Sequence, residues 1–396
     1  MCKIDVDNVI FFPHKLDIRA GGPAGYIANL KNRLDANNIK VVSADKFCFD
    51  LFELMKFFIK LIPNKQWRKS LRFRVNFAKM CSKHLPLFLF FKLHRYNFKT
   101  IICHRVWDVP MIRRYINKYN PTAKLMLMSH CPQSPSSEFW EALESRQKKQ
   151  ITLKKIEKFE KEAFELADYL IFPSDEATEP YSFSIPYFDE LKKTKKFYYI
   201  PTGANKIEIS KNKEELRNKY NITTQYVISY LGRHNEIKGY DLLKKIAQSI
   251  LDKRDDITFL IAGNLSNDIK PLEHPKWIEI GRTHPTNVLS IADLFILPNR
   301  QTYFDLVLLE VLSSGVPVFA SNTGGNKSVY KQTGAIKLYD TIDDCVNLID
   351  EFFMLTEKER KALGNKCVDS YLANYTPEIF ANNYKNMIKQ IVEDIK

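Results

Sequence analysis

The segment from Tyr230 to Tyr240 places charged side chains and glycines at the end of an apolar strand pattern, and it reads Tyr-Leu-Gly-Arg-His-Asn-Glu-Ile-Lys-Gly-Tyr. Ligands of parallel α/β sheets bind outside the carboxyl ends of the strands. A diphosphate there suits both cations, because Arg233 presents a planar fork of donors and Lys238 a compact charge. A helix that begins near Gly239 adds its positive N-terminus. The segment predicts a diphosphate site, with plain surface residues beside a turn as the alternative.

A second segment, from Leu297 to Ala320, again predicts a strand end, a loop, a helix and a strand. Glu310 stands inside the otherwise apolar helix pattern of residues 306–312. A carboxylate in such surroundings is costly unless it accepts hydrogen bonds, for example from the paired hydroxyls of a ribose. The alternative is a glutamate at the helix edge that reaches solvent.

Two histidines follow predicted strands in the first half of the chain. His130 comes after the strand pattern of residues 124–129, and His104 ends the pattern of residues 100–103. The near-neutral pKa of histidine suits hydrogen bonding to a sugar hydroxyl or to developing charge, whereas a packing role is the alternative. The pair Gly21-Gly22 lets a backbone approach a phosphate or an acceptor, or makes an ordinary turn.

Strands and helices alternate through the whole chain, which predicts mostly parallel sheets covered by helices on both faces. We expect strands at residues 8–14, 99–103, 124–129, 169–172, 226–231, 258–262, 277–280, 294–297 and 317–320, and a last strand of the first domain that enters a turn within residues 197–203. The expected helices include residues 240–251 and 306–313. A polar stretch near residues 203–213 predicts the linker. We therefore expect an α/β protein with domains at residues 1–203 and 204–376, and an amphipathic helix at 377–396 that crosses back to the first domain.

The formal charge of +14 is unevenly distributed. Residues 51–100 hold twelve Lys and Arg residues, many aromatic residues and a single acid, Glu53. This mixture is typical of a segment that lies on an anionic lipid surface. The alternatives are core aromatics beneath a solvated basic face, and nucleic-acid binding, for which no further motif is present.

The seven cysteines never form a Cys-x-x-Cys pair, so neither a zinc site nor a disulfide framework is predicted. The longest apolar run, Leu85–Phe91, is far shorter than the ~20 residues of a spanning helix. We expect a cytoplasmic protein, with peripheral contact with the inner face of the cell membrane as an open possibility.

The run from Gly232 to Gly239, together with residues 308–318 and Thr323-Gly324-Gly325, resembles the retaining glycosyltransferases of family 4, also called glycosyl transferases group 1. Residues 200–203 and 167–174 extend the resemblance along most of the chain. It implies the GT-B fold, in which two doubly wound Rossmann-like domains face each other across a cleft. It also implies a donor diphosphate on Arg233 and Lys238, a ribose on Glu310, and no divalent metal or other cofactor.

The resemblance implies a wider site as well. His130 matches a histidine that family members place close to the reacting sugar, so His130, Arg233 and Lys238 are the expected catalytic residues. The expected donor-binding residues are Gly22, Gly232, Arg233, Lys238, Gly263, Arg282, Thr302, Asp305, Leu306, Val307 and Glu310.

The chain departs from the family pattern at the transferred sugar. The family has a glutamate eight positions before the one that matches Glu310, and this chain has Thr302 there. Asp305 stands where the family usually has glycine. The sugar contact is then expected from Asp305, or from Thr302 with backbone amides.

The leading hypothesis is an enzyme that transfers a sugar, with retention, from a nucleoside diphosphate sugar to a glycan or lipid-linked acceptor in bacterial surface polysaccharide or glycoconjugate synthesis. UDP is the expected nucleotide because the family most often uses it. The first alternative is a catalytically silent subunit that binds glycan or a partner protein, and the second is a sugar-nucleotide epimerase.

Overall fold

The computed structural model describes residues 3–16, 22–34, 38–44, 51–210, 212–264 and 269–395. Gly21 lies outside these residues. The chain divides into two compact units. Unit 1 contains Met1–Phe172, Tyr181–Ile200 and Ala381–Lys396, and unit 2 contains Pro173–Pro180 and Pro201–Phe380.

Unit 1 is built on a sheet of six parallel strands in the order β2-β1-β3-β4-β5-β6. Its strands are β1 (Ile4–Phe12), β2 (Ile39–Ser43), β3 (Tyr96–Cys103), β4 (Lys124–Met128), β5 (Tyr169–Phe172) and β6 (Lys196–Tyr199). The helical segments up to residue 194 are α1 (Gly22–Lys31), α2 (Leu51–Lys60), α3 (Lys65–Met80), α4 (Leu87–His94), η1 (Val106–Asp108), α5 (Val109–Tyr119), α6 (Pro135–Glu141), α7 (Ser145–Lys148), α8 (Leu153–Leu166), η2 (Glu176–Thr178), α9 (Glu179–Ser184) and α10 (Phe188–Thr194).

Unit 2 is built on a second sheet of six parallel strands, in the order β12-β11-β10-β7-β8-β9. Its strands are β7 (Tyr226–Leu231), β8 (Ile257–Ala262), β9 (Trp277–Glu279), β10 (Leu294–Leu297), β11 (Val318–Ser321) and β12 (Lys337–Tyr339). The later helices are α11 (Lys213–Lys219), α12 (Tyr240–Leu251), α13 (Pro285–Leu289), α14 (Leu306–Ser314), α15 (Gly324–Thr333), α16 (Ile342–Met354), α17 (Glu357–Asn374) and α18 (Pro377–Asp394).

The central strands are apolar without alternation, because helices cover both faces of a parallel sheet. Every residue of β8 is buried, and so is every residue of β10. The predicted strands therefore recur in the structure. The edge strands β2 and β12 were not predicted, because they are short and carry polar or half-buried residues.

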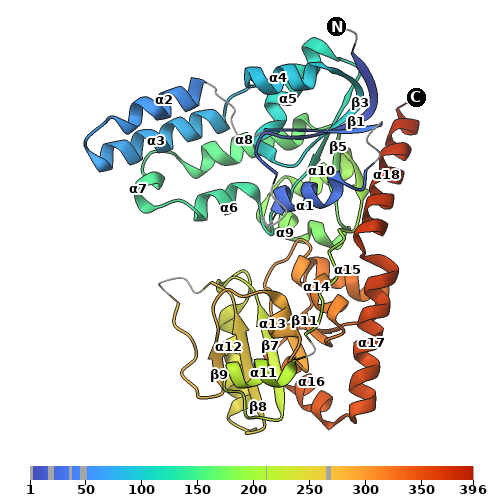
Figure 1. The fold of residues 1–396 in the computed structure, drawn as a ribbon. Helices are drawn as coiled ribbons and strands as arrows, with labels where there is room; N and C mark the ends of the chain where they lie inside the picture. The colour runs from blue at the N-terminus through green and yellow to red at the C-terminus, as the bar shows by residue number, and fades with distance from the viewer. Residues whose placement is uncertain are drawn as a thin grey trace. The chain divides into compact units, whose positions relative to one another are not determined.

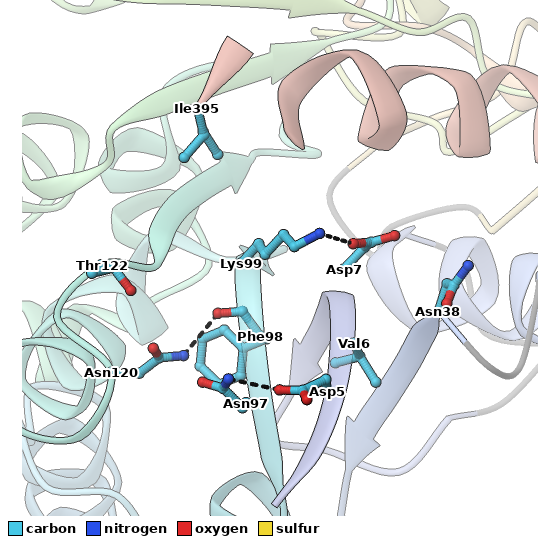
Figure 2. Close-up of a pocket in the computed structure, with 10 residues that line it drawn as sticks. All are labelled: Asp5, Val6, Asp7, Asn38, Asn97, Phe98, Lys99, Asn120, Thr122 and Ile395. Carbon is cyan, nitrogen blue, oxygen red and sulfur yellow. Dashed lines mark hydrogen bonds and ion pairs between the residues drawn. The ribbon is translucent and has the colours of Figure 1, made fainter. Parts of the chain in front are cut away.

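The strand β1 begins at Ile4, earlier than predicted, because its first acidic residues lie at the open amino edge of the sheet. There Asp5 accepts a hydrogen bond from Asn97 at 2.7 Å, and Asp7 forms an ion pair with Lys99 at 2.8 Å. Figure 2 shows these pairs on the wall of a small polar pocket. Both acids have partners, and the pocket lies at the edge opposite to the one where ligands of such sheets bind.

Each sheet has one point where the strand order reverses, between β1 and β3 in unit 1 and between β7 and β10 in unit 2. At such a point the connections after neighbouring strands run to opposite faces of the sheet, and ligands of this fold class bind there, at the carboxyl edge. In unit 2 these are the β7–α12 loop and the β10–α14 loop. The topology thus brings together the two segments that the sequence analysis selected.

The segment Pro173–Pro180 belongs to unit 2, although the predicted domain boundary assigns it to the first domain. Glu179 accepts hydrogen bonds from the backbone N–H of Gly324 at 3.0 Å and from Lys327 at 2.8 Å. Glu176 forms an ion pair with Lys331 at 2.6 Å. These charge-assisted contacts hold the segment against α15, and sequence pattern alone does not reveal them.

The residues of α18 from Ala381 onward belong to unit 1. Tyr384 and Ile391 are fully buried, and the Tyr384 hydroxyl lies 3.4 Å from the side-chain oxygen of Asn8 on β1. Near the helix end, Asp394 accepts hydrogen bonds from Tyr198 at 2.8 Å and Lys196 at 2.5 Å on β6. In Figure 1 this helix, drawn in red, runs beside the strands of unit 1. The last helix is thus part of the first sheet's covering layer.

Replacing Tyr384 by alanine should lower the free energy of unfolding of unit 1 by about 3–5 kcal/mol, because a buried aromatic ring is lost and a cavity remains. Lys389→Ala, at an exposed position of the same helix, should change it by less than about 0.5 kcal/mol. The free energy of unfolding of both variants is measured by urea unfolding, with hydrogen–deuterium exchange of peptides from β1 and β3 as the probe of unit 1. Equal effects of the two changes would show that α18 does not stabilise the sheet.

Candidate functional site

The β7–α12 and β10–α14 loops of unit 2 are in direct backbone contact. Gly239 has a φ of 65°, and a Cβ atom there would lie 1.7 Å from the carbonyl oxygen of Pro298. Only glycine combines this left-handed conformation with such a close approach. Across the same contact, the Arg300 N–H donates to the Ile237 carbonyl at 2.9 Å, and the Arg300 guanidinium pairs with Asp241 at 2.5 and 2.6 Å. The β7–α12 and β10–α14 loops are therefore held together by direct contacts.

Lys238 and Asp305 meet between these loops. Their ion pair measures 2.6 Å, and the two side chains are only 14% and 15% exposed. Asn299 donates a second hydrogen bond, at 2.6 Å, to the same Asp305 oxygen. Asp305 is the N-cap of α14, but its side chain makes no capping hydrogen bond because it is turned toward Lys238. In this structure the predicted phosphate lysine is thus neutralised by an acid of its own chain.

Two other predicted cation sites, Arg233 and Arg282, follow β7 and β9 at the same carboxyl edge. Both side chains are exposed, and no described residue hydrogen-bonds or pairs with either guanidinium. The N-termini of α12 and α14 also begin at this edge, and each adds partial positive charge from unpaired backbone N–H groups. The edge can therefore attract an anion even while Lys238 is paired.

Glu310 lies one turn into α14 and is half-buried. Its carboxylate accepts no hydrogen bond from the residues that the structure describes. Burial, and to a smaller extent the negative charge of Asp305, raises the pKa of Glu310 to about 7. A carboxylate in this state can accept hydrogen bonds from neutral hydroxyl groups, which would offset the cost of its burial.

The remaining predicted residues of unit 2 shape the backbone around this edge. A Cβ atom on Gly263 would lie 1.8 Å from the Gly232 carbonyl, so these glycines bring the ends of β8 and β7 together. Leu306 and Val307 are half-buried at the start of α14. Thr302 is only 1% exposed, and its carbonyl accepts the N–H of Gly325 at 3.4 Å. Thr302 therefore serves here as a packing residue between loops.

The sequence analysis missed a buried polar cluster behind the β7–α12 loop. His234 is 2% exposed and stacks on Tyr240 with ring centroids 4.3 Å apart. Its Nδ1 lies 3.6 Å from Glu279, which accepts hydrogen bonds from Tyr240 and, at 3.0 Å, from Trp277. Burial lowers the pKa of His234, against the opposing effect of Glu279. The cluster packs behind the β7–α12 loop and supports it. The available sequence signal was Glu279, an acid at the end of a predicted strand.

The sequence analysis also missed Asn299 and Arg300, which bind Asp305 and Asp241 from the loop after β10. Both follow a predicted strand end, so their position was a usable signal. The partner of Asn299 lies six residues away, whereas the partner of Arg300 lies 59 residues away in the sequence.

His130 and Gly22 belong to unit 1. Gly22 is the first residue of α1. His130 follows β4 and is half-buried, and its Nε2 lies 2.9 Å from Nδ1 of the buried His104 after β3. Burial lowers the pKa of His130 to about 3 and that of His104 well below its usual value. The two predicted histidines thus form one neutral pair at the carboxyl edge of the first sheet.

Within the described parts of the chain, no group of three or more His, Cys, Asp or Glu side chains could hold a metal ion. In those same parts, no helix is long and apolar enough to cross a membrane.

Two units that each hold a parallel, doubly wound sheet with one point of strand reversal are characteristic of the GT-B fold. Structural comparison agrees: sucrose-phosphate synthase from Thermosynechococcus elongatus matches 98% of this chain and 100% of its own, with a TM-score of 0.64 and 15% identity. HepE from Anabaena in complex with UDP-glucose matches 98% of this chain and 99% of its own, with a TM-score of 0.62 and 13% identity. The predicted fold class is confirmed.

The model of the family "Glycosyl transferases group 1" matches residues 212–367, which contain the two joined loops. Among curated proteins, 2-deoxystreptamine N-acetyl-D-glucosaminyltransferase of Niallia circulans is 23% identical over 43% of this chain and 47% of its own length. D-inositol 3-phosphate glycosyltransferase of Corynebacterium urealyticum is 28% identical over 42% of both chains. The chain thus spans less than half the length of these relatives. The predicted family resemblance is confirmed.

Glu310 should make stability depend on pH. Its pKa is raised from 4.5 to about 7 in the folded protein, so the folded state holds the proton more tightly than the unfolded state. Its contribution is present below the unfolded pKa and is lost as the pH rises through about 7, by up to about 3 kcal/mol.

Glu310→Gln should therefore remove part of the loss of thermal stability between about pH 5 and about pH 8. Scanning calorimetry at several pH values measures the difference between wild type and variant. Glu351→Gln, at an exposed position of α16, is the control and should follow the wild type. A Glu310→Gln profile parallel to the wild type would mean that Glu310 titrates normally.

Proposed function

We propose that this protein is a glycosyltransferase that moves a sugar from a nucleoside diphosphate sugar to a hydroxyl group of an acceptor, with retention of the anomeric configuration. In this reaction the bond between the anomeric carbon and the diphosphate oxygen breaks, and a bond to the acceptor oxygen forms. The diphosphate leaves with the electron pair of the broken bond, and the proton of the acceptor hydroxyl passes to the departing diphosphate oxygen or to water. Negative charge therefore grows on the leaving group, and an enzyme must stabilise that charge.

The observation that carries the proposal is the junction of the β7–α12 and β10–α14 loops. It gathers Lys238, the exposed Arg233 and the N-termini of α12 and α14 at the reversal point of the sheet. Preorganised donors of this kind are each worth about 3–4 kcal/mol of the barrier. The carboxylate of Glu310, which accepts no hydrogen bond from the described residues, suits the two hydroxyls of a ribose.

These cations make a divalent metal unnecessary in the proposed reaction. A metal ion would stabilise the departing diphosphate as a Lewis acid, and in the proposed reaction Arg233, two helix N-termini and a Lys238 released from Asp305 supply positive charge instead. We propose a metal-independent enzyme with no other cofactor.

UDP is the proposed nucleotide, and support comes from the HepE structure, which is described as a complex with UDP-glucose. A hexosyl or N-acetylhexosaminyl group is proposed for transfer, since one curated relative is named an N-acetyl-D-glucosaminyltransferase. For the acceptor we propose a glycan or a lipid-linked saccharide in bacterial surface polysaccharide or glycoconjugate synthesis, in the cytoplasm.

Thermal stability in the presence of UDP, GDP, ADP and CMP tests the donor site. A ligand at 100 times its dissociation constant stabilises the folded protein by about 2.7 kcal/mol. UDP should raise the melting temperature of the wild type, and Lys238→Ala and Glu310→Ala should abolish the shift. Lys245→Ala, an exposed lysine of α12, is the matched control and should keep it.

If a nucleotide other than UDP raises the melting temperature of the wild type, and both variants lose that effect, the donor site is supported but the proposed base is wrong. A wild-type protein that responds to none of the nucleotides would contradict the donor site. Incubation with the bound donor and a saccharide acceptor then separates a transferase from an epimerase, because an epimerase converts the donor without an acceptor.

A silent glycosyltransferase-like subunit is the second candidate, and the Lys238–Asp305 ion pair favours it. Asp305 forms an ion pair with Lys238, the lysine that a diphosphate would use. Thr302 is buried between loops, which leaves it little surface for contact with a sugar. Nucleotide binding without hydrolysis, transfer or epimerisation would support this candidate. Asp305→Gly, which restores the residue usual in the family, should then strengthen UDP binding.

We also propose that α2, α3 and α4 bring unit 1 to an anionic membrane surface. In Figure 1, α2 and α3 form a helical hairpin that extends from the rest of unit 1. Phe57 and Phe58 on α2 are each 57% exposed, and Trp67 on α3 is 69% exposed. Exposed lysines lie among them, including Lys60 and Lys65. Large exposed aromatics with cations suit the interface of a bilayer that contains acidic lipids.

Vesicle sedimentation tests this surface. The wild type should bind vesicles that contain phosphatidylglycerol, and bind less at high salt or to phosphatidylcholine alone. Phe57→Ser with Phe58→Ser should weaken binding by at least about tenfold, because two apolar side chains are lost from the interface. The control is Leu372→Ser on α17, another exposed apolar residue. If Leu372→Ser weakens vesicle binding as much as the double variant, or if the wild type does not bind, the proposed membrane surface is wrong.

A further inference from the structure

Lys238 and Asp305 form an enclosed ion pair in which the carboxylate is held from two sides. Nζ of Lys238 lies 2.6 Å from Oδ2 of Asp305, and Nδ2 of Asn299 donates to that same oxygen at 2.6 Å. The two charged side chains are 14% and 15% exposed, and Asn299 is buried. The Asn299 carbonyl in turn accepts a hydrogen bond from the Ser321 hydroxyl at 2.5 Å. The ion pair is therefore part of the packed junction between the β7–α12 and β10–α14 loops.

Asp305 could place its carboxylate on its own helix instead. It is the N-cap residue of α14, and its φ of −79° and ψ of 117° are those of an extended residue at a helix start. An aspartate at this position commonly accepts a backbone N–H of the first helical turn, but the Asp305 side chain makes no such hydrogen bond. Two positions are thus within the reach of one carboxylate, and in this structure it lies on Lys238.

The ion pair lowers the affinity of Lys238 for any other anion. An anion that contacts Lys238 must first separate it from Asp305, so its apparent dissociation constant is the intrinsic one divided by the fraction of molecules in which the pair is open. Arg233 carries no such cost, because no described residue pairs with its guanidinium. The two cations of the candidate diphosphate site therefore differ: one is available at once, and the other only by exchange of partners.

We propose that Asp305 is a built-in counter-ion that competes with the donor diphosphate for Lys238, so that the diphosphate binds by displacing the carboxylate. In the exchange, Lys238 passes from Asp305 to a phosphate oxygen, and the Asp305 carboxylate turns to the N-cap position of α14. No covalent bond changes and no proton moves. The identity of the anion as the donor diphosphate rests on the proposed glycosyltransferase function, whereas the masking of Lys238 does not.

The same competition acts on the product. After sugar transfer the nucleoside diphosphate still holds Lys238, and Asp305 is the internal anion that takes the lysine back as the product leaves. Product release limits the turnover of many enzymes. Asp305 therefore weakens the binding of the diphosphate and shortens its stay on the protein.

Inorganic pyrophosphate tests the masking of Lys238 without a base, a sugar or any activity. Asp305→Asn removes the charge at nearly constant shape, and Asp305→Ser removes it and keeps a good N-cap residue. In calorimetric titration both should bind pyrophosphate at least about tenfold more tightly than the wild type. Glu236→Gln removes an exposed acid from the same β7–α12 loop and should change the dissociation constant by less than about threefold. No gain with either Asp305 variant, or an equal gain with Glu236→Gln, would overturn the proposal.

A Lys238→Ala background separates masking from simple repulsion between Asp305 and the anion. If Asp305 acts by occupying Lys238, adding Asp305→Asn to Lys238→Ala should improve pyrophosphate binding by less than about threefold. If Asp305 only repels anions, the double variant should gain as much as Asp305→Asn gains alone, and that result would overturn the proposal. Cooperative thermal unfolding of each variant shows that it is folded.

UDP titrations of the same variants separate this proposal from the proposed function. UDP should bind Asp305→Asn about tenfold more tightly than the wild type, mostly through slower dissociation. Tighter pyrophosphate binding by Asp305→Asn, with no response of any variant to UDP or another nucleotide, would support the counter-ion and refute the donor site. UDP binding by the wild type that Asp305→Asn leaves unchanged would support the donor site and refute the counter-ion.

Discussion

The contact between the backbones of Gly239 and Pro298 is the constraint on which the rest of unit 2 depends. A Cβ atom at Gly239 would lie 1.7 Å from the Pro298 carbonyl oxygen, so the loops after β7 and β10 can meet only because that side chain is absent. Their meeting places Lys238 beside Asp305 and directs the N-termini of α12 and α14 to one edge. Without this approach, the same residues would remain separate surface features on two loops.

At this edge of the sheet, one cation of the candidate site is already compensated by an acid of the same chain, while other positive groups remain exposed. Lys238 is paired with Asp305, so the positive charge left for an anion comes from Arg233, Arg282 and the helix N-termini. Glu310 is half-buried and accepts no hydrogen bond from any residue that the structure describes, and its pKa is raised to about 7. An incoming ligand with both a diphosphate and hydroxyl groups would satisfy the two features together.

At the carboxyl edge of the first sheet, burial affects a pair of histidines. His104 and His130 share one hydrogen bond at the end of neighbouring strands, and both are kept neutral by their surroundings. A neutral imidazole pair has direction, because one ring must donate and the other accept. The strand register is what makes the pair possible, since Cys103 on β3 lies opposite Leu127 on β4. The histidines that follow these strands are therefore brought to the same edge.

The sequence by itself determined the class of fold and the loops that matter. Apolar runs bounded by glycine and polar residues predict buried parallel strands, and the cationic residues between Gly232 and Gly239 stand out after one of them. These are local signals. What only the tertiary structure decided are the partners: the pairing of Lys238 with Asp305, the burial of Thr302, the His234–Glu279 cluster, and the attachment of Pro173–Pro180 to unit 2. Each depends on which strands are neighbours and on how closely two backbones approach, and these distances are set by packing between residues far apart in the chain.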